Sequence, residues 1–204
     1  MGKTRRSATS ASRAAAKAAS REALIEAATE LYPKHGLDVS LDEICAHAGY
    51  TRGAFYVHFQ TRDELTLEVM TRLGKRFMNA LFGDAESKRV AGMSELFEHF
   101  FGQLFSGEYP MTRHGGLRPY QLLDACVRSP DVHRGYLALV DECIGRLAIY
   151  VREDQERGRV RNDLDAEVIA KITIALVIGV HTLYDLDFSI DFAEAVPALL
   201  GVRS

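Results

Sequence analysis

The sequence predicts an all-α fold in which a few short helices near the N-terminus precede a larger set of longer helices. Apolar residues recur at spacings of three and four along most of the 204 residues, which is the periodicity of a helix face. The alternating, β-branched patterns of strands are scarce. A hydrophobic fraction of 47% supplies enough apolar surface to bury a core, so the chain fits one large or two small domains.

Composition also limits where the protein works. No apolar run reaches the roughly 18 residues that a membrane span needs. The basic N-terminus leads into alanines and serines rather than into the apolar segment of a secretory signal. We therefore expect a soluble, cytoplasmic protein with no membrane partner.

The three cysteines, Cys45, Cys126 and Cys143, are odd in number and far apart. Their spacing fits neither a disulfide framework nor a zinc knuckle. We expect small buried thiols in a reducing cell, with a redox-active Cys126 or Cys143 as the alternative. The histidines show no metal-ligand spacing, and neither a nucleophile motif nor a glycine-rich phosphate loop is present, so we expect no metal, no cofactor and no enzymatic activity.

Charge is distributed unevenly although the net charge is only -3. The first 21 residues contain no acid and six cations, Lys3, Arg5, Arg6, Arg13, Lys17 and Arg21. Acidic residues outnumber basic ones from Asp63 onward. A basic end joined to an acidic body suits a chain in which only the first end meets phosphates, although a basic tail can also serve solubility alone.

The N-terminal elements follow in order. Residues 1–20 are rich in Ala, Ser and Arg and lack large apolar side chains, so they predict a flexible basic arm, helical at most near its end. From Arg21 a helical apolar stripe runs to Gly36, with Pro33 in its final turn.

Three helix starts then fall close together. Ser40 to Glu43 and Thr61 to Glu64 are capping boxes, in which a hydroxyl and a carboxylate satisfy backbone donors at a helix start. Between them Gly49 provides a sharp exit from the first short helix, and Thr51 caps a second one through His58. The third start opens a long helix from about Arg62 to Leu81.

The rest of the chain reads as further helices, separated by an irregular loop at Gly107 to Gly116. They cover about 94–105, 119–127, 130–157, 166–180 and 191–200. Ser129 before Pro130 gives one N-cap, and Asp165 gives another. The segment Val168 to Val180 is apolar on nearly every face.

Two short helices joined by a glycine turn form the unit that places a second helix in the DNA major groove. The segment carries Ala27-Ala28-Thr29-Glu30-Leu31-Tyr32, Gly36, Ser40, Ala48-Gly49, Thr51-Arg52-Gly53-Ala54-Phe55-Tyr56-Val57-His58-Phe59 and Arg62. In these residues, Arg21 to Met70 resembles the TetR family of bacterial regulators, departing from its pattern at Pro33 and Tyr50. The resemblance implies a helix-turn-helix DNA-binding domain at 21–66 and an all-α ligand-binding and dimerisation domain at 67–204.

The resemblance also implies roles for individual residues. Ser40, Thr51, Tyr56, His58 and Arg62 would contact or position phosphates, and Arg52 with the backbone of Gly53 would reach base edges. Hydroxyls and helix N-terminal amides suit phosphate oxygens, and arginine can bridge two acceptors of guanine. Phe55 and Phe59 are expected to pack inside the domain, and a packed or exposed ring is the alternative for His58. The basic arm would enter the minor groove or attract phosphates.

In the family the last two main helices pair with those of a second subunit. The apolar helix after Asp165 offers Ile172, Leu176 and Ile178 for such a homodimer, unless the subunit's own helices cover them. Two-fold symmetry would then predict an inverted-repeat operator in double-stranded DNA.

The effector site is inferred from composition. Aromatic and soft side chains mixed with a few polar ones suit a moderately apolar small molecule. The candidates are Phe97, Phe101, Phe105, Tyr109, Arg118, Tyr120, Asp124, Tyr136 and Cys143.

The sequence thus predicts a ligand-responsive transcriptional regulator, a dimeric repressor released from its operator by that effector. The alternatives are a thiol-based redox sensor on the same fold, an activator, and non-specific DNA compaction.

Overall fold

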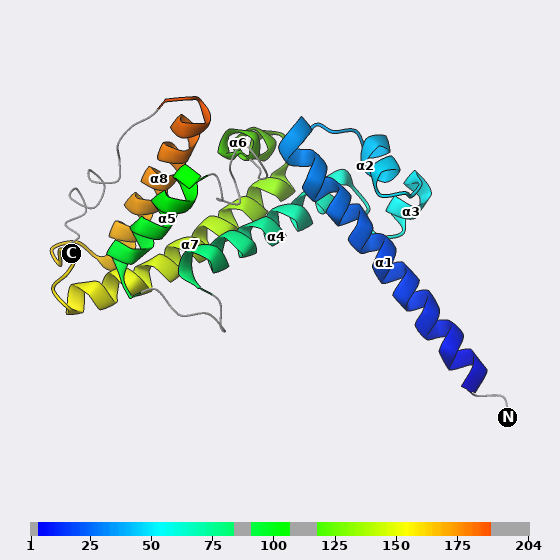
Figure 1. Cartoon of the computed structure of the whole chain (residues 1–204), viewed down its shortest axis with the longest axis horizontal. Helices are drawn as coiled ribbons and strands as arrows, with labels where there is room; N and C mark the ends of the chain where they lie inside the picture. The colour runs from blue at the N-terminus through cyan, green and yellow to red at the C-terminus, as the bar shows by residue number, and fades with distance from the viewer. Residues whose placement is uncertain (1–3, 84–90, 107–117, 189–204) are drawn as a thin grey trace. The chain divides into compact units, whose positions relative to one another are not determined.

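The computed structural model describes residues 4–83, 91–106 and 118–188. Within these residues the chain forms α-helices and no strand, which confirms the predicted all-α class. The helices are α1 (Thr4–His35), α2 (Leu41–His47), α3 (Arg52–Tyr56), α4 (Arg62–Phe82), α5 (Met93–Ser106), α6 (Pro119–Arg128), α7 (Pro130–Glu156) and α8 (Ala166–Asp185) (Figure 1). The predicted helix at 191–200 lies outside the described residues.

The chain divides into two compact units, Met1–Val69 and Met70–Ser204. In the first unit α1, α2 and α3 contact one another, and in the second α7 packs against α5, α6 and α8. Helix α4 starts in the first unit and ends in the second. The domain boundary predicted at residue 66 remains a prediction, because compactness alone does not show which part folds or acts independently.

The first unit has a small core built from all four of its helices. Tyr32 from α1, Ile44 from α2, Phe55 from α3 and Leu65 from α4 are completely buried. The Tyr32 hydroxyl lies 2.9 Å from the hydroxyl of buried Thr66, so a buried polar pair connects α1 to α4. Phe55 and Phe59 both lie in this core, as expected of residues that pack the domain rather than face DNA.

Helix α1 begins at Thr4 and therefore runs through most of the segment that the sequence assigns to a flexible arm. No glycine or proline occurs between Thr4 and Tyr32, and alanine is the residue with the highest helix propensity. Residues 12–19 are all exposed. Figure 1 shows this first half of α1, in dark blue, extending away from α2 and α3.

The second unit encloses the larger core. Phenylalanines from α5 and aliphatic residues from α7 and α8 form one buried cluster with the end of α4. The helix starts at Pro130 and Ala166 are capped by Ser129 and Asp165 as predicted, with each side chain accepting from a backbone N–H of the first turn.

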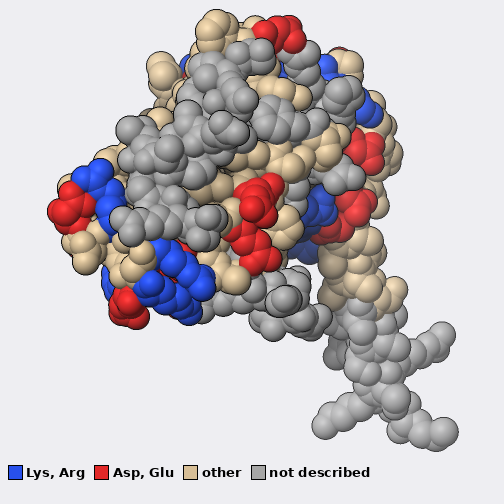
Figure 2. All heavy atoms as spheres, turned by 60° about the vertical axis from the view of Figure 1, so that its left-hand side comes forward, with Lys and Arg blue, Asp and Glu red and all other residues tan. Residues whose placement is uncertain are grey.

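Helix α8 is long and apolar enough to cross a membrane by length and composition, a test that the core helix of a soluble protein also passes. One face of α8 packs against α7. On the face of the molecule in Figure 2, acidic and basic side chains are interspersed rather than gathered by sign.

Candidate DNA-binding surface and ligand cavity

The turn between α2 and α3 is built by the predicted caps. Ser40 and Glu43 form a complete capping box at the start of α2, with the Glu43 N–H donating to the Ser40 hydroxyl over 3.2 Å. Gly49 leaves α2 with a φ of 74°, a left-handed conformation that favours glycine. Thr51 then caps α3 by accepting from the N–H of Ala54. Local sequence therefore fixes the angle at which α3 leaves α2.

Helix α3 presents polar side chains and a glycine to solvent. Thr51, Arg52, Gly53 and Tyr56 are all exposed, whereas Phe55 points into the core. A Cβ added at Gly53 would meet only the Thr51 hydroxyl at 3.6 Å, so the glycine leaves this side of the helix open to a close approach. The predicted base-reading and phosphate-contacting residues of α3 thus lie on one accessible face.

Arg52 is held by a partner that the sequence pattern did not single out. Its Nε lies 2.5 Å from Asp42 Oδ1 and its Nη2 lies 2.8 Å from Oδ2, a two-point ion pair between α3 and α2. Both side chains are more than half exposed, so the pair contributes little stability. Arg52 can therefore leave Asp42 at low cost. The only signal for this pair in the sequence is the spacing of Asp42 and Arg52 across the turn.

His58 faces α1 rather than open solvent. Its Nε2 lies 2.7 Å from the Ser20 hydroxyl, and the ring is half-buried. Burial, followed by the charges of Lys17 and Arg21, lowers the pKa of His58. A neutral ring near neutral pH makes a weaker phosphate ligand than a protonated one, so the structure adds a packing role to the predicted phosphate contact.

Arg62 is also engaged within the first unit. Its guanidinium donates to the Leu37 carbonyl in the loop between α1 and α2 and is half-buried. Ser40, Thr51, Arg52, Gly53 and Tyr56 are exposed, whereas His58 and Arg62 are partly withdrawn. The roles of all seven residues in DNA binding remain predictions.

A cavity lies inside the second unit. Its volume is about 120 Å³, and residues of α4, α5, α6, α7 and α8 surround it. Most of its wall is apolar; Thr173 and His181, two turns apart on α8, are buried polar exceptions. The Thr173 hydroxyl donates to the Ile169 carbonyl. Apolar cavities of about 150 Å³ bind benzene-sized molecules, so this space suits a small apolar group.

Three of the predicted effector residues line this cavity: Phe97, Tyr136 and Cys143. Phe101 is buried beside them but does not line it. The other predicted residues are placed elsewhere or not described. Arg118 donates to the Tyr120 hydroxyl, Asp124 pairs with Arg128 on α6, and Tyr109 and the side chain of Phe105 lie outside the described part.

Most of the cavity wall was not among the predicted residues. Helix α4 contributes Leu73, Phe77 and Met78, and α8 contributes Val177 and His181. The apolar stripe of α4 is visible in the sequence as a helical period, but a stripe alone cannot distinguish a cavity wall from a filled core.

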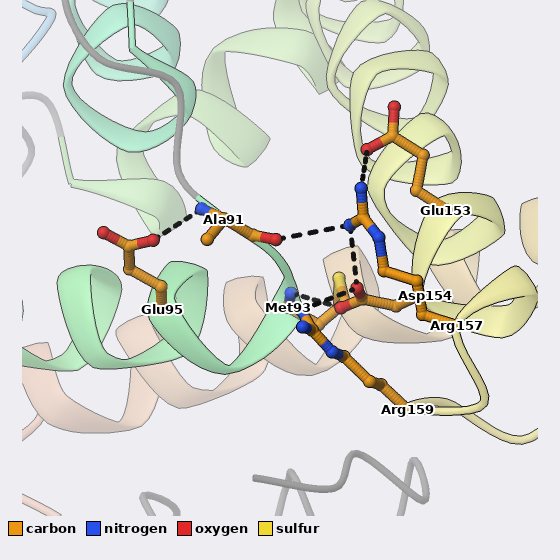
Figure 3. Close-up of polar contacts among 7 residues, drawn as sticks. All are labelled: Ala91, Met93, Glu95, Glu153, Asp154, Arg157 and Arg159. Carbon is orange, nitrogen blue, oxygen red and sulfur yellow. Dashed lines mark hydrogen bonds and ion pairs between the residues drawn. The ribbon is translucent and has the colours of Figure 1, made fainter.

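A buried carboxylate anchors the helix that carries Phe97. Asp154 of α7 is 2% exposed, and its Oδ2 accepts from the N–H of Met93 at the start of α5 over 2.8 Å. Arg157 and Arg159 approach Oδ1 at 3.5 and 3.8 Å (Figure 3). A Cβ at Gly92 would lie 2.6 Å from Oδ2. The carboxylate thus caps α5 and fixes that wall of the cavity.

The thiols do not specifically favour redox chemistry. Burial raises the pKa of Cys45 and Cys126, and it raises the pKa of Cys143 to about 12. The thiolate is the reactive form, so each of these shifts slows oxidation. No group of three or more metal-binding side chains occurs among the described residues.

Part of α8 is apolar and exposed. Val168 and Ile172 are 44% and 40% exposed, and exposed Ala175 and half-buried Gly179 continue the same side of the helix. Of the other residues predicted for dimerisation, Leu176 and Ile178 are half-buried, and Ile178 also lines the cavity.

Known proteins resemble both parts of the chain. Residues 24–69 match the family described as bacterial regulatory proteins, tetR family. The HTH-type transcriptional regulator YwcC of Bacillus subtilis, itself uncharacterized, is 26% identical over 170 residues, which are 78% of this chain and 73% of YwcC. The HTH-type transcriptional regulator EthR of Mycolicibacterium smegmatis is 25% identical over 72% of this chain and 66% of its own length.

Solved structures share the fold. GusR of Salmonella enterica aligns with a TM-score of 0.69 at 17% identity, covering 89% of this chain and 93% of GusR. SmeT in complex with triclosan aligns with a TM-score of 0.65 at 24% identity, covering 89% of this chain and 88% of SmeT. SmeT is described as the repressor of a multidrug efflux pump of Stenotrophomonas maltophilia. With the helix-turn-helix described above, the family match at residues 24–69 and the two HTH-type relatives support a DNA-binding transcriptional regulator of the TetR family.

Proposed function

We propose that the protein is a dimeric repressor that binds an inverted-repeat operator in the cytoplasm and is released by a small, moderately apolar effector. The observation that carries this proposal is the apolar cavity whose wall includes α4. The same helix begins at Arg62 in the first unit. A ligand that displaces α4 in the second unit therefore acts on an element that the DNA-binding unit shares.

The dimer is supported by the exposed apolar side of α8. Val168, Ile172, Ala175 and Gly179 repeat at spacings of four, three and four, which places them along one side of a helix. Small residues at the last two positions allow a second helix to approach closely. A two-fold copy of this helix would cover apolar surface that the monomer leaves in water.

The release mechanism is a shift between two populations. The effector must bind the released geometry better than the DNA-bound geometry, and a coupling free energy of about 1 to 3 kcal/mol changes operator affinity by about 5-fold to 150-fold. The complex of SmeT with triclosan supports an aromatic, apolar effector class for this chain.

Operator selection is the first experiment. Duplexes bound by the full chain are selected from a random library at near-physiological salt, with Arg52→Ala selected in parallel. We expect an enriched inverted repeat for the wild type and loss of its most constrained base pairs for the variant. A library that stays random after several rounds would contradict the proposed function.

Effector release is tested with triclosan as the first probe. Val177→Trp fills the cavity, whereas the matched substitution Val127→Trp adds the same ring at an α6 position that is 87% exposed. We expect triclosan to release wild type and Val127→Trp from the operator and to leave Val177→Trp bound. Equal release of both variants would place the effector outside this cavity.

A further inference from the structure

We propose that the first half of α1, residues Thr4–Ala19, is a helical extension of the DNA-binding surface that contacts phosphates beside each half-site. The proposal rests on the DNA-binding function stated above. It assigns a partner to a helical segment that the packing of the protein leaves in solvent.

The first observation is that this part of α1 is exposed and adds nothing to the packing of the fold. Residues 12–19 are exposed at every position, so no other element of the unit packs against this part of the helix. Mostly alanine and serine side chains separate its cations, and such a helix gains no hydrophobic burial. Stability of the fold therefore does not explain why the helix continues here.

The second observation is the arrangement of charge. Arg13, Lys17 and Arg21 follow one another at intervals of four, which places them on one face of α1. No acid occurs in the first 21 residues to neutralise that face within the helix. Like charges at this spacing destabilise a helix in water, and phosphates placed along the face would reverse that effect.

The third observation fixes the direction in which the face points. The Ser20 hydroxyl lies 2.7 Å from Nε2 of His58, and His58 is the second residue after the end of α3. Arg21 pairs with Glu68 at 2.8 Å and lies over the Phe59 ring at 5.2 Å from its centroid. These interactions fix the rotation of α1 where it leaves the core. The charges of Lys17 and Arg21 reach His58, so the basic face begins beside α3 and continues outward through Arg13.

The test compares two double variants of the full chain that remove the same charge. Arg13→Gln with Lys17→Gln removes the two outer cations of the basic face and keeps Arg21 in its pair with Glu68. Lys75→Gln with Arg152→Gln removes one lysine and one arginine from exposed positions of the second unit. Affinity for the selected operator and for a scrambled duplex is measured by fluorescence anisotropy between about 0.05 and 0.3 M salt.

We expect the extension variant to bind both duplexes about tenfold more weakly and to keep the same preference between them. The slope of log affinity against log salt should fall by about 0.9 for each phosphate that the variant no longer neutralises, that is, by roughly 3 to 4 for a dimer. Unchanged affinity and slope would overturn the proposal, as would an equal effect of the control variant.

A second pair of variants asks whether the helix itself matters. Ala15→Pro breaks the helix and keeps every cation, whereas Ala15→Gln keeps both the helix and its cations. We expect Ala15→Pro to lose most of the DNA affinity that the charge-removing variant loses, and Ala15→Gln to bind DNA like the wild type. Full affinity of Ala15→Pro, or a change of base preference beside the half-sites, would instead indicate a flexible arm or a minor-groove interaction. If the wild type selects no operator, the proposed function fails independently of this result.

Discussion

The two units of this protein differ in how closely their candidate functional residues follow one another along the chain. In the first unit, caps, a glycine turn and exposed α3 residues all fall between Ser40 and Glu64. In the second, the cavity wall gathers side chains from five helices that are spread over more than a hundred residues. A reading surface is a local property of the chain, whereas a cavity depends on how distant helices pack.

The largest effect is expected from truncating a buried side chain in the core of the first unit. Phe55→Ala removes a fully buried ring, which costs about 3 to 5 kcal/mol of unfolding free energy. A small unit with few other buried rings loses most of its stability by this change. We expect operator binding to vanish while size-exclusion chromatography still shows the dimer and benzene still binds the cavity.

Val57→Ala is the control for that substitution, because Val57 is nearby in the chain and 59% exposed. It should retain operator binding. Loss of cavity binding in Phe55→Ala would mean that the two units do not fold separately, and the contrast between them would fail.

The second effect concerns the wall of the cavity. Asp154→Ala removes the cap of α5 and leaves the N–H of Met93 without its acceptor, at a cost of about 2 to 3 kcal/mol. We expect a lower unfolding temperature and weaker benzene binding by calorimetry. Gly92→Ala should act in the same direction by displacing the carboxylate.

Glu153→Gln controls for charge at the adjacent position, where the side chain approaches Arg157 at 3.9 Å near the surface. It should change the unfolding temperature little. An Asp154→Ala protein as stable as Glu153→Gln would contradict the anchoring role of Asp154.

These contrasts show what sequence can and cannot predict. The all-α class follows from the helical spacing of apolar residues. The helix starts at Leu41, Arg52 and Arg62 follow from caps, which act through backbone groups three residues away. Arg118, Tyr120 and Asp124 have the chemistry expected of ligand residues, but on α6 and at the residue before it they make local interactions and do not line the cavity. The sequence does not predict His181 as a cavity residue, because a single histidine in an apolar helix carries no signal until its neighbours are known.

A smaller effect is expected from protonation of the first unit. Because the pKa of His58 is lowered in the folded state, the unfolded chain binds a proton first as the pH falls below about 6.5. Stability contributed by the neutral ring is therefore present above that pH and lost below it. Amide hydrogen exchange in α2 and α3 should accelerate as the pH falls below about 6.5.

His58→Gln can still bond to Ser20 but does not titrate, so it should remove this dependence. His99→Gln, at an exposed site in the second unit, should leave it unchanged. An identical pH profile for wild type and His58→Gln would show that other groups control acid stability.

The smallest effect concerns the partner of Arg52. The ion pair with Asp42 is exposed at both ends, so breaking it costs about 0.2 to 1 kcal/mol. Asp42→Asn releases Arg52 toward DNA and also removes a negative charge beside the reading surface. We expect operator affinity to rise by less than about fivefold, measured by anisotropy against Glu26→Gln, which removes one exposed acid from α1 of the same unit. If Asp42→Asn binds more weakly instead, the pair orients Arg52 for the base edge rather than competing with it, and the reading surface includes α2 as well as α3.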